Sequence, residues 1–269
     1  MRPDAKKVFY FSADANSLGG FIDTPFQKIV PSQASVSLPP VGGHAATRTE
    51  AFNFEGIISC RSAYTRVTGT QATPDGPWST TVTSVVEGLN ILEVITAERL
   101  VAQVSVEYTR DDRYLGISLA GSHFDRVRLG GCDAFPRLNP TLLCGAKASI
   151  AFPVFQQTGR EQARRIIESA DAGRDGSRWV LDRFGWMARE PEEDRCVLSS
   201  LVDGLDGGVP GTSFGHVLDL PGFGRIFLGE LLVCPRSIQF SWIRAELGCS
   251  VSGGVNASSA RANGSTYPP

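Results

Sequence analysis

Three groups of residues have types and spacings that could support chemistry. The first is the stretch 211–215, Gly-Thr-Ser-Phe-Gly, which matches the G-x-S-x-G pattern. In hydrolases that pattern exposes a nucleophilic serine on a sharp turn between a strand and a helix. Here it follows the loop-like Gly-Gly-Val-Pro at 207–210 and enters 216–220, His-Val-Leu-Asp-Leu, which reads as a strand. We therefore interpret Ser213 as a turn residue and not as a nucleophile.

The second group consists of the histidines. His123 and Asp125 would place an imidazole and a carboxylate on one face of a strand, and Asp219 follows His216 by three residues. A metal ion needs three or four protein ligands, and no second cluster lies nearby in the sequence. We interpret these histidines, and His44, as strand residues hydrogen-bonded to Asp or water, and we expect no metal and no cofactor.

The third group consists of adjacent carboxylates at 111–112 and 192–194. Such pairs could carry out acid–base chemistry on a sugar, with Trp179 and Trp186 as stacking platforms. Acidic runs in Arg-rich turns are more typical of solvated surface, and Trp in an aromatic cluster is more typical of core. Glycan binding or hydrolysis therefore stays an alternative, and we assign no catalytic residue.

Composition and charge restrict the class of protein. The chain has 269 residues, 42% of them hydrophobic, and a net charge of −2, which is ordinary for a soluble globular protein. Its arginines are interleaved with Asp and Glu, so the sequence predicts no basic face for nucleic acid. Only four apolar or aromatic residues, at 8–11, follow the charged N-terminus, so we expect neither a secretory signal nor a membrane span.

The cysteines are scattered and show no CxxC spacing. Their even number leaves a disulfide framework open, but a chain of this length does not need one, and buried free thiols are the preferred interpretation. Reduced thiols and the absent signal together predict a cytoplasmic location. The six cysteines are Cys60, Cys132, Cys144, Cys196, Cys234 and Cys249.

The elements that must position these groups are mainly β-strands. In residues 100–108, Val104 and Val106 alternate with polar residues, as in a half-buried strand. The stretch 80–130 contains five such short segments, which are too closely spaced for parallel crossovers and therefore predict an antiparallel meander. The five segments are 79–86, 91–96, 100–108, 114–120 and 124–129. Residues 216–247 repeat the pattern. The expected fold is an antiparallel β-sandwich or flattened barrel with one short helix.

That helix is predicted at 162–170. Thr158 can cap it, and Glu161 stands three residues later, as in a capping box. The remainder divides into a single β-rich domain at 1–249 and a Gly/Ser/Asn-rich segment at 250–269, which has almost nothing to bury and is expected to be a flexible tail. Prolines at 25–43 predict an extended arm lying on the body or on a neighbour.

The segments 80–104, TTVTSVVEGLNILEVITAERLVAQV, and 121–131, GSHFDRVRLGG, resemble β-rich bacterial proteins of the "choice-of-anchor" kind, most of them uncharacterised. The resemblance implies a surface or structural role. With it, the sequence predicts a non-enzymatic structural or interaction protein that forms homo-oligomers through the arm and the tail, without a nucleic-acid or membrane partner. A carbohydrate-binding or glycan-hydrolysing β-module is the alternative, with a glycan as its ligand.

Overall fold

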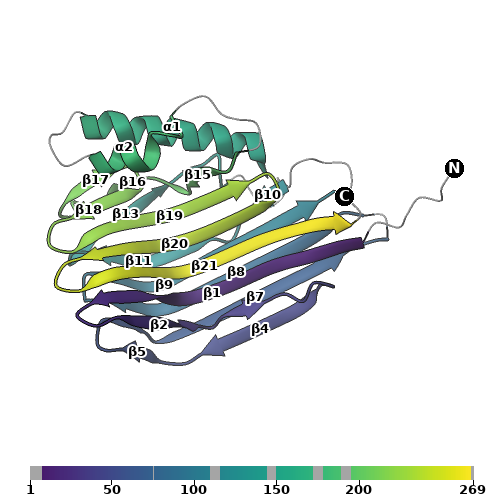
Figure 1. Cartoon of the computed structure of the whole chain (residues 1–269), viewed down its shortest axis with the longest axis horizontal. Coiled ribbons are helices and arrows are strands. Elements are labelled where there is room, and N and C mark those ends of the chain that lie inside the picture. The colour runs from purple at the N-terminus through teal and green to yellow at the C-terminus, as the bar shows by residue number, and fades with distance from the viewer. Residues whose placement is uncertain are drawn as a thin grey trace.

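The computed structural model describes residues 8–74, 76–109, 116–143, 150–171, 178–188 and 195–267. Within them, two antiparallel β-sheets pack face to face, and two helices cover one end of the stack (Figure 1). The predicted antiparallel sandwich is therefore confirmed. The acidic runs at 111–112 and 192–194 and Cys144 lie outside the described residues.

The first sheet, sheet A, has the strand order β17-β18-β19-β20-β21-β1-β2, with β15 also paired to β19 and β3 to β1. The first and last strands of the chain are thus neighbours. Its strands are β1 (Val8–Thr24), β2 (Lys28–Gln33), β3 (Val36–Ser37), β15 (Val197–Ser200), β17 (Thr212–Phe214), β18 (Val217–Leu220), β19 (Gly224–Cys234), β20 (Ser237–Gly248) and β21 (Ser252–Tyr267).

The second sheet, sheet B, has the order β12-β11-β9-β8-β6-β5, with β7 also on β8, β4 on β7, β10 on β9 and β14 on β10. A separate two-stranded sheet pairs β13 (Phe135–Leu138) with β16 (Val202–Asp206). The strands of sheet B are β4 (Gly43–Thr49), β5 (Phe52–Phe54), β6 (Ile58–Cys60), β7 (Ser62–Gln71), β8 (Trp78–Ile91), β9 (Ile95–Tyr108), β10 (Gly116–Ser118), β11 (His123–Leu129), β12 (Cys132–Asp133) and β14 (Ile150–Ala151).

The main core lies between the two sheets. Val104 and Val106 of β9 are fully buried, as the alternation at 100–108 predicted. At one end of this core the Phe9 ring stacks on Trp78, with 4.8 Å between ring centroids, and lies 4.9 Å from Tyr108. Strand alternation therefore identified the buried face of the central hairpin correctly.

The turn of that hairpin was not predicted. Residues 91–96 were expected to be strand, but β8 and β9 are joined there by a tight turn in which Leu92 and Glu93 both have positive φ, 53° and 59°. Two such residues match the right-handed twist of the flanking strands, and the pairing of Ile91 with Ile95 leaves three residues in the loop. The sequence lacks the Asn-Gly or Asp-Gly pair that normally marks a hairpin turn, which is why it was missed.

The expected flexible tail is instead a central strand, and that prediction was wrong. β21 pairs with β1 along one edge and with β20 along the other. Its inward residues are small, among them Ala257, Ala260 and Ala262, and all three are buried. Small inward side chains allow close approach of the opposite sheet, so the segment's low hydrophobicity did not indicate disorder.

The arm at 25–43 lies on its own chain. β2 and β3 pair with β1, at the edge of sheet A. Contacts on the sheet B side hold this edge in place: the Phe26 and Phe54 rings lie 6.3 Å apart, and Lys28 Nζ lies 2.6 Å from Glu55 Oε1. Of the two placements predicted for the arm, the structure shows the one on the body.

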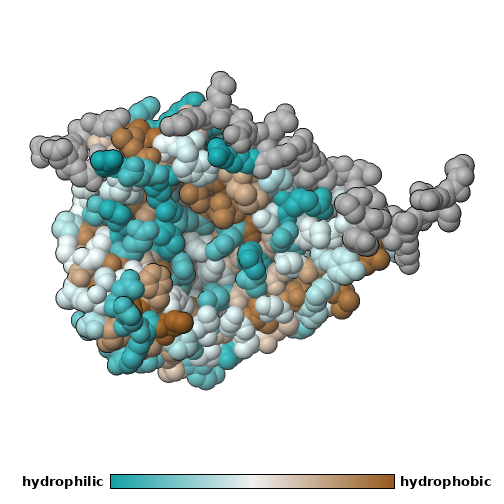
Figure 2. Space-filling model, viewed as in Figure 1, coloured by the Kyte–Doolittle hydropathy of each residue, from teal (hydrophilic) through white to brown (hydrophobic). Residues whose placement is uncertain are grey.

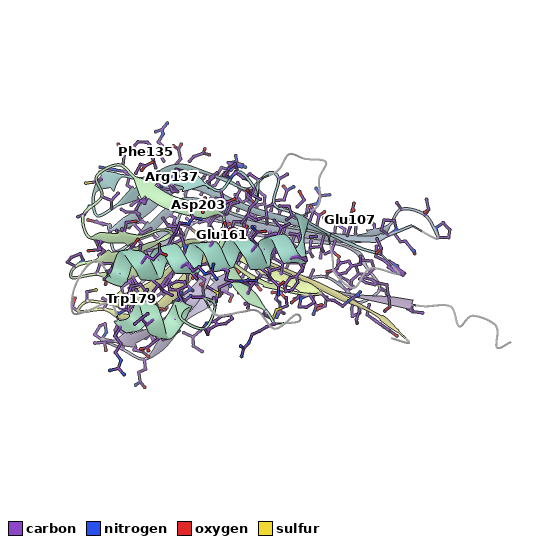
Figure 3. The ribbon with its side chains drawn as sticks, turned by 90° about the horizontal axis from the view of Figure 1, so that it is seen from above. Glu107, Phe135, Arg137, Glu161, Trp179 and Asp203 are labelled. Atoms are coloured by element: carbon purple, nitrogen blue, oxygen red, sulfur yellow. A yellow bond between two sulfur atoms is a disulfide. The ribbon has the colours of Figure 1, made fainter. Side chains whose placement is uncertain are left out.

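The helical layer is larger than predicted. α1 (Phe152–Asp171) begins before Thr158, with Pro153 in its first turn, where the missing N–H costs little. Gly159 lets α1 approach β15 closely, because a Cβ there would lie 2.4 Å from the Leu198 carbonyl oxygen. α2 (Arg178–Phe184) was not predicted. Seen from above, α1 runs along the top of the sandwich and α2 lies beside it (Figure 3).

A disulfide joins Cys196 to Cys234, so the expectation of free thiols was wrong for this pair. The adjacent pairing of Val197 with Val233 in β15 and β19 brings the two cysteines opposite each other. Cys60 is a buried free thiol, as expected, and burial raises its pKa.

Among the described helices, none is long and apolar enough to cross a membrane.

Candidate functional site

Ser213 lies in β17 and is exposed. Its hydroxyl donates to the Gly215 carbonyl oxygen at 3.3 Å, and the chain continues into the short strand β18. The motif therefore sits in a strand–turn–strand context and not in the strand–turn–helix context that a nucleophilic serine requires. Ser213 is nevertheless a strand residue, and the turn lies at 215–216, so its interpretation as a turn residue was wrong.

His123 and His44 lie in strands β11 and β4, as predicted, whereas His216 comes just before β18. His123 Nδ1 lies 2.9 Å from the Gly121 carbonyl oxygen, and no bond to Asp125 forms. His44 Nδ1 lies 3.4 Å from Thr68 Oγ1. His216 is buried and faces Glu230, with 3.9 Å between Nε2 and Oε1, instead of Asp219. Across the described residues, no group of three or more His, Cys, Asp or Glu side chains could hold a metal ion.

The two tryptophans proposed as sugar platforms belong to the helical layer. Trp179 is on α2, where Figure 3 labels it, and its ring lies 5.8 Å from Phe214 with the Arg225 guanidinium 4.3 Å from its centroid. Trp186 follows α2 and is 37% exposed. The structure does not bring these rings together with a described pair of carboxylates.

A groove of about 530 Å³ lies elsewhere, on the outer face of sheet B. Figure 1 shows β8, β9 and β11 behind sheet A, so the groove opens on the side away from the viewer. Its walls are almost entirely charged. The lining residues are Arg61, Glu87, Glu98, Arg99, Phe124, Asp125 and Arg126.

The groove lies where three neighbouring strands break their alternation at the same level. Regular strands bury every second residue, but here successive core-facing residues are three positions apart. Two consecutive residues of each strand therefore face outward, and they are mostly charged. The core-facing pairs are Val86 and Leu89 in β8, Ala97 and Leu100 in β9, and Phe124 and Val127 in β11.

Gly88 is required at this level of β8. Its φ is +62°, which side chains rarely adopt, and a Cβ there would lie 2.9 Å from the Cβ of Arg61. The Arg61 amide donates to the Glu87 carbonyl oxygen at 2.8 Å. Glycine thus lets the chain bring the Arg61 side chain to the edge of the groove.

Arg126 of β11 has an unusual backbone conformation at the same level of the sheet. It is a non-glycine residue with φ of 46°, a conformation that costs about 1 kcal/mol. Its side chain is bound to the neighbouring strand, with Nε 3.0 Å from Glu98 Oε2. Strained backbone of this kind is concentrated at functional sites, and local irregularity in a strand re-aims side chains.

The remaining contacts fix the centre of the groove. Glu87 accepts a hydrogen bond from the Ser62 hydroxyl at 2.9 Å and lies 3.9 Å from Arg99 Nε. Arg99 Nη2 donates to the Tyr64 hydroxyl oxygen at 3.2 Å. Among the described residues, the Arg61 guanidinium and the Asp125 carboxylate have no side-chain partner. The groove therefore offers fixed ion pairs at its centre and an unpaired charge on each side.

A second polar cluster lies between α2 and sheet A. Glu230 binds Arg183 Nη2 and Arg244 Nε, each at 2.7 Å, and Arg244 also binds Glu246 at 2.6 Å. Burial would raise the pKa of Glu230, but His216, Arg244 and Arg183 outweigh it and hold that pKa well below its usual range. This network attaches α2 to sheet A.

The groove was not predicted, because its residues form none of the catalytic or metal-binding patterns. The available indication was the pairing of charged doublets inside strands, Glu98-Arg99 and Asp125-Arg126, where a regular strand would bury one member of each. That indication becomes interpretable only once the strands are known to be neighbours. The sequence pattern places Asp125 with His123, whereas its cross-strand neighbour in the structure is Arg99.

Comparison with known proteins places the whole groove inside a family match. No curated protein and no solved structure matches the chain. The family match covers residues 9–234, from β1 to the end of β19, and includes every residue that lines the groove. Over this match the chain belongs to the family described as a domain of unknown function, DUF8256.

Proposed function

We propose that the protein is a non-enzymatic interaction protein and that the charged groove on sheet B is its binding surface. The observation that carries the proposal is the alignment of the irregularity across β8, β9 and β11, which turns charged side chains outward in one place. Arginine and carboxylate held in ion pairs present hydrogen-bond donors and acceptors in fixed positions. Preorganised polar groups around a hollow favour recognition.

The balance of positive and negative charge in the groove restricts the class of ligand. Three arginines and three carboxylates line the groove, so it gives no net attraction for a polyanion such as nucleic acid. A ligand with both donors and acceptors fits better. The carbohydrate-binding alternative applies to the same surface, because Phe124 lines the groove beside the carboxylates of Glu98 and Asp125.

Thermal shift measurements test the proposal. The protein is screened against neutral oligosaccharides, small anions and zwitterions, and the same screen is run on Arg99→Gln, Glu98→Gln and the control Arg261→Gln. Arg261 pairs with Asp14 on the outer face of sheet A, away from the groove. We expect at least one class to raise the melting temperature of the parent and the control but not of the groove variants. The proposal would be refuted if all three variants kept the ligand-induced rise in melting temperature. It would also be refuted if no class of ligand raised the melting temperature of the parent.

Self-association is a second candidate, favoured by one observation. Phe21 and Ile29 are cross-strand partners in β1 and β2, and they are 50% and 79% exposed. Figure 2 shows hydrophobic atoms on this face at the lower left, where β1 and β2 lie. Exposed apolar residues beside an edge strand are typical of a contact between copies.

Light scattering after size exclusion tests this candidate with two matched variants. Ile29→Lys should convert an oligomer to monomer, whereas Val41→Lys, at an equally exposed residue away from this pair, should not. A parent protein that elutes as a monomer at high concentration would reject self-association.

A further inference from the structure

The charges of the groove form an alternating row across four adjacent strand positions. The Arg61 amide is bonded to Glu87 of β8, Glu87 is opposite Arg99 of β9, and Arg99 is opposite Asp125 of β11. Read across the sheet, the order is positive, negative, positive, negative. Only the two ends of the row, Arg61 and Asp125, lack a side-chain partner among the described residues.

The two ends are separated by a defined distance. Neighbouring strands are about 4.8 Å apart, so three strand spacings place the backbones of Arg61 and Asp125 about 14 Å from each other. Both side chains are exposed and lie on the same groove. The surface therefore presents one free cation and one free anion at opposite sides of a single hollow.

We propose that the groove binds an extended zwitterion, namely a short peptide with free ends, whose carboxylate lies at Arg61 and whose amino group lies at Asp125. The inference rests on the proposed function of the groove. A guanidinium fork binds a carboxylate through paired hydrogen bonds, and a carboxylate accepts hydrogen bonds from an ammonium group. An extended peptide advances about 3.3 Å per residue, so three or four residues span the row.

Other classes of ligand complement the alternating charges of the groove less well. A neutral oligosaccharide would leave both end charges without a counter-charge, and a simple anion would occupy Arg61 but meet the carboxylates of Glu87 and Asp125. Glu87 and Arg99 are already engaged with Ser62, Tyr64 and each other. The end groups are therefore the ones that select the ligand.

Isothermal titration calorimetry tests the proposal with tetra-alanine, its N-acetylated form, its C-amidated form and maltotetraose. We expect tetra-alanine to bind, and N-acetylation to weaken binding about tenfold, the loss of one charge-assisted contact. The Asp125→Asn protein should lose the same factor in affinity for unmodified tetra-alanine. It should bind the acetylated peptide no more weakly than the parent protein does. Arg61→Gln should behave in the same way toward the C-amidated peptide. Arg261→Gln is the control and should bind tetra-alanine like the parent.

The outcomes separate the two proposals. If blocked peptides bind as well as tetra-alanine, or if binding does not peak at three or four residues in a series from two to six alanines, the zwitterion inference is wrong. Binding of maltotetraose that is lost in Arg99→Gln, without binding of tetra-alanine, would also overturn it but leave the groove as the binding surface. If no probe binds in a manner sensitive to Arg61, Arg99 or Asp125, both proposals fail.

Discussion

The hydroxyl of Ser258 in β21 donates a hydrogen bond to the backbone carbonyl of Ser84 in β8, 2.9 Å away. The same hydroxyl accepts a hydrogen bond from the Ala102 amide of β9 at 3.1 Å. Ser258 has φ of 55°, so β21 departs from regular strand geometry at this residue. A side chain of sheet A thus completes the backbone hydrogen bonding of sheet B inside the core.

Ser258→Ala is therefore expected to destabilise the protein. It leaves a buried amide and a buried carbonyl without this partner, which costs about 2 kcal/mol of the free energy of unfolding. The control is Ser259→Ala, because Ser259 is the next residue but its hydroxyl bonds Ser241 on the outer face, at 3.1 Å. Chemical denaturation checks both. Equal effects of the two substitutions would contradict the bridging role.

Thr80→Val is expected to have the opposite effect. Thr80 is fully buried in β8, and its hydroxyl has no hydrogen-bond partner among the described residues. Replacing an unsatisfied buried hydroxyl by a methyl group of similar size removes a desolvation cost and should raise the free energy of unfolding by about 1 kcal/mol. Thr81→Val is the control, since the Thr81 hydroxyl lies 3.1 Å from Ser105 Oγ. A lower melting temperature for Thr80→Val would show that the hydroxyl is satisfied.

The Glu230 network predicts how stability depends on pH. The pKa of Glu230 is held low in the folded protein, and an unfolded Glu has a pKa of about 4.3. The unfolded chain therefore binds the proton first. The stabilisation is complete above the unfolded pKa and is lost as the pH falls from there toward the folded pKa.

Glu230→Gln tests this dependence. At neutral pH it should lower the free energy of unfolding by about 3 kcal/mol, because Arg183 and Arg244 keep their charges under α2 without their shared partner. Its stability should also fall less steeply than that of the parent between about pH 5 and pH 3, a range that spans the ordinary pKa of Glu. Urea titrations across this range make the comparison. Parallel pH profiles for the two proteins would rule out Glu230 as a source of the acid sensitivity.

The central hairpin was predictable because local alternation and burial agree there. Val104 and Val106 are buried as their spacing indicated, and the strands at 216–247 were also found. β21 was not predictable in the same way, since its strand character comes from two neighbours and not from its own side chains. Local propensity carries little information for such a segment.

The groove and the disulfide were missed for a related reason. Each depends on residues that are distant in the sequence and become neighbours only through strand pairing. Cys196 and Cys234 face each other because β15 pairs with β19, and Asp125 joins Arg99 because β11 pairs with β9. Spacing along the chain indicates one face of one strand, but not which strand lies beside it.

Removal of β21 provides the most direct test of the architecture. In the intact chain β21 lies between β20 and β1, and it carries Ser258 and the buried Ala260 and Ala262. A chain that ends at Gly248 would leave both neighbouring strands with open edges in the middle of sheet A, and open edges favour aggregation. We expect this truncated protein to show no cooperative thermal unfolding transition.

A synthetic peptide of residues 250–267 should restore that transition when it is added during refolding, since a missing strand can be supplied by a separate chain through main-chain pairing. A peptide with Ala260→Asp and Ala262→Asp should not, because both side chains would enter the core. A peptide with Ser259→Asp and Ser265→Asp should still act, since these two residues lie on the outer face of β21. If the truncated protein melted like the parent without any peptide, β21 would not be the strand that joins the two halves of sheet A.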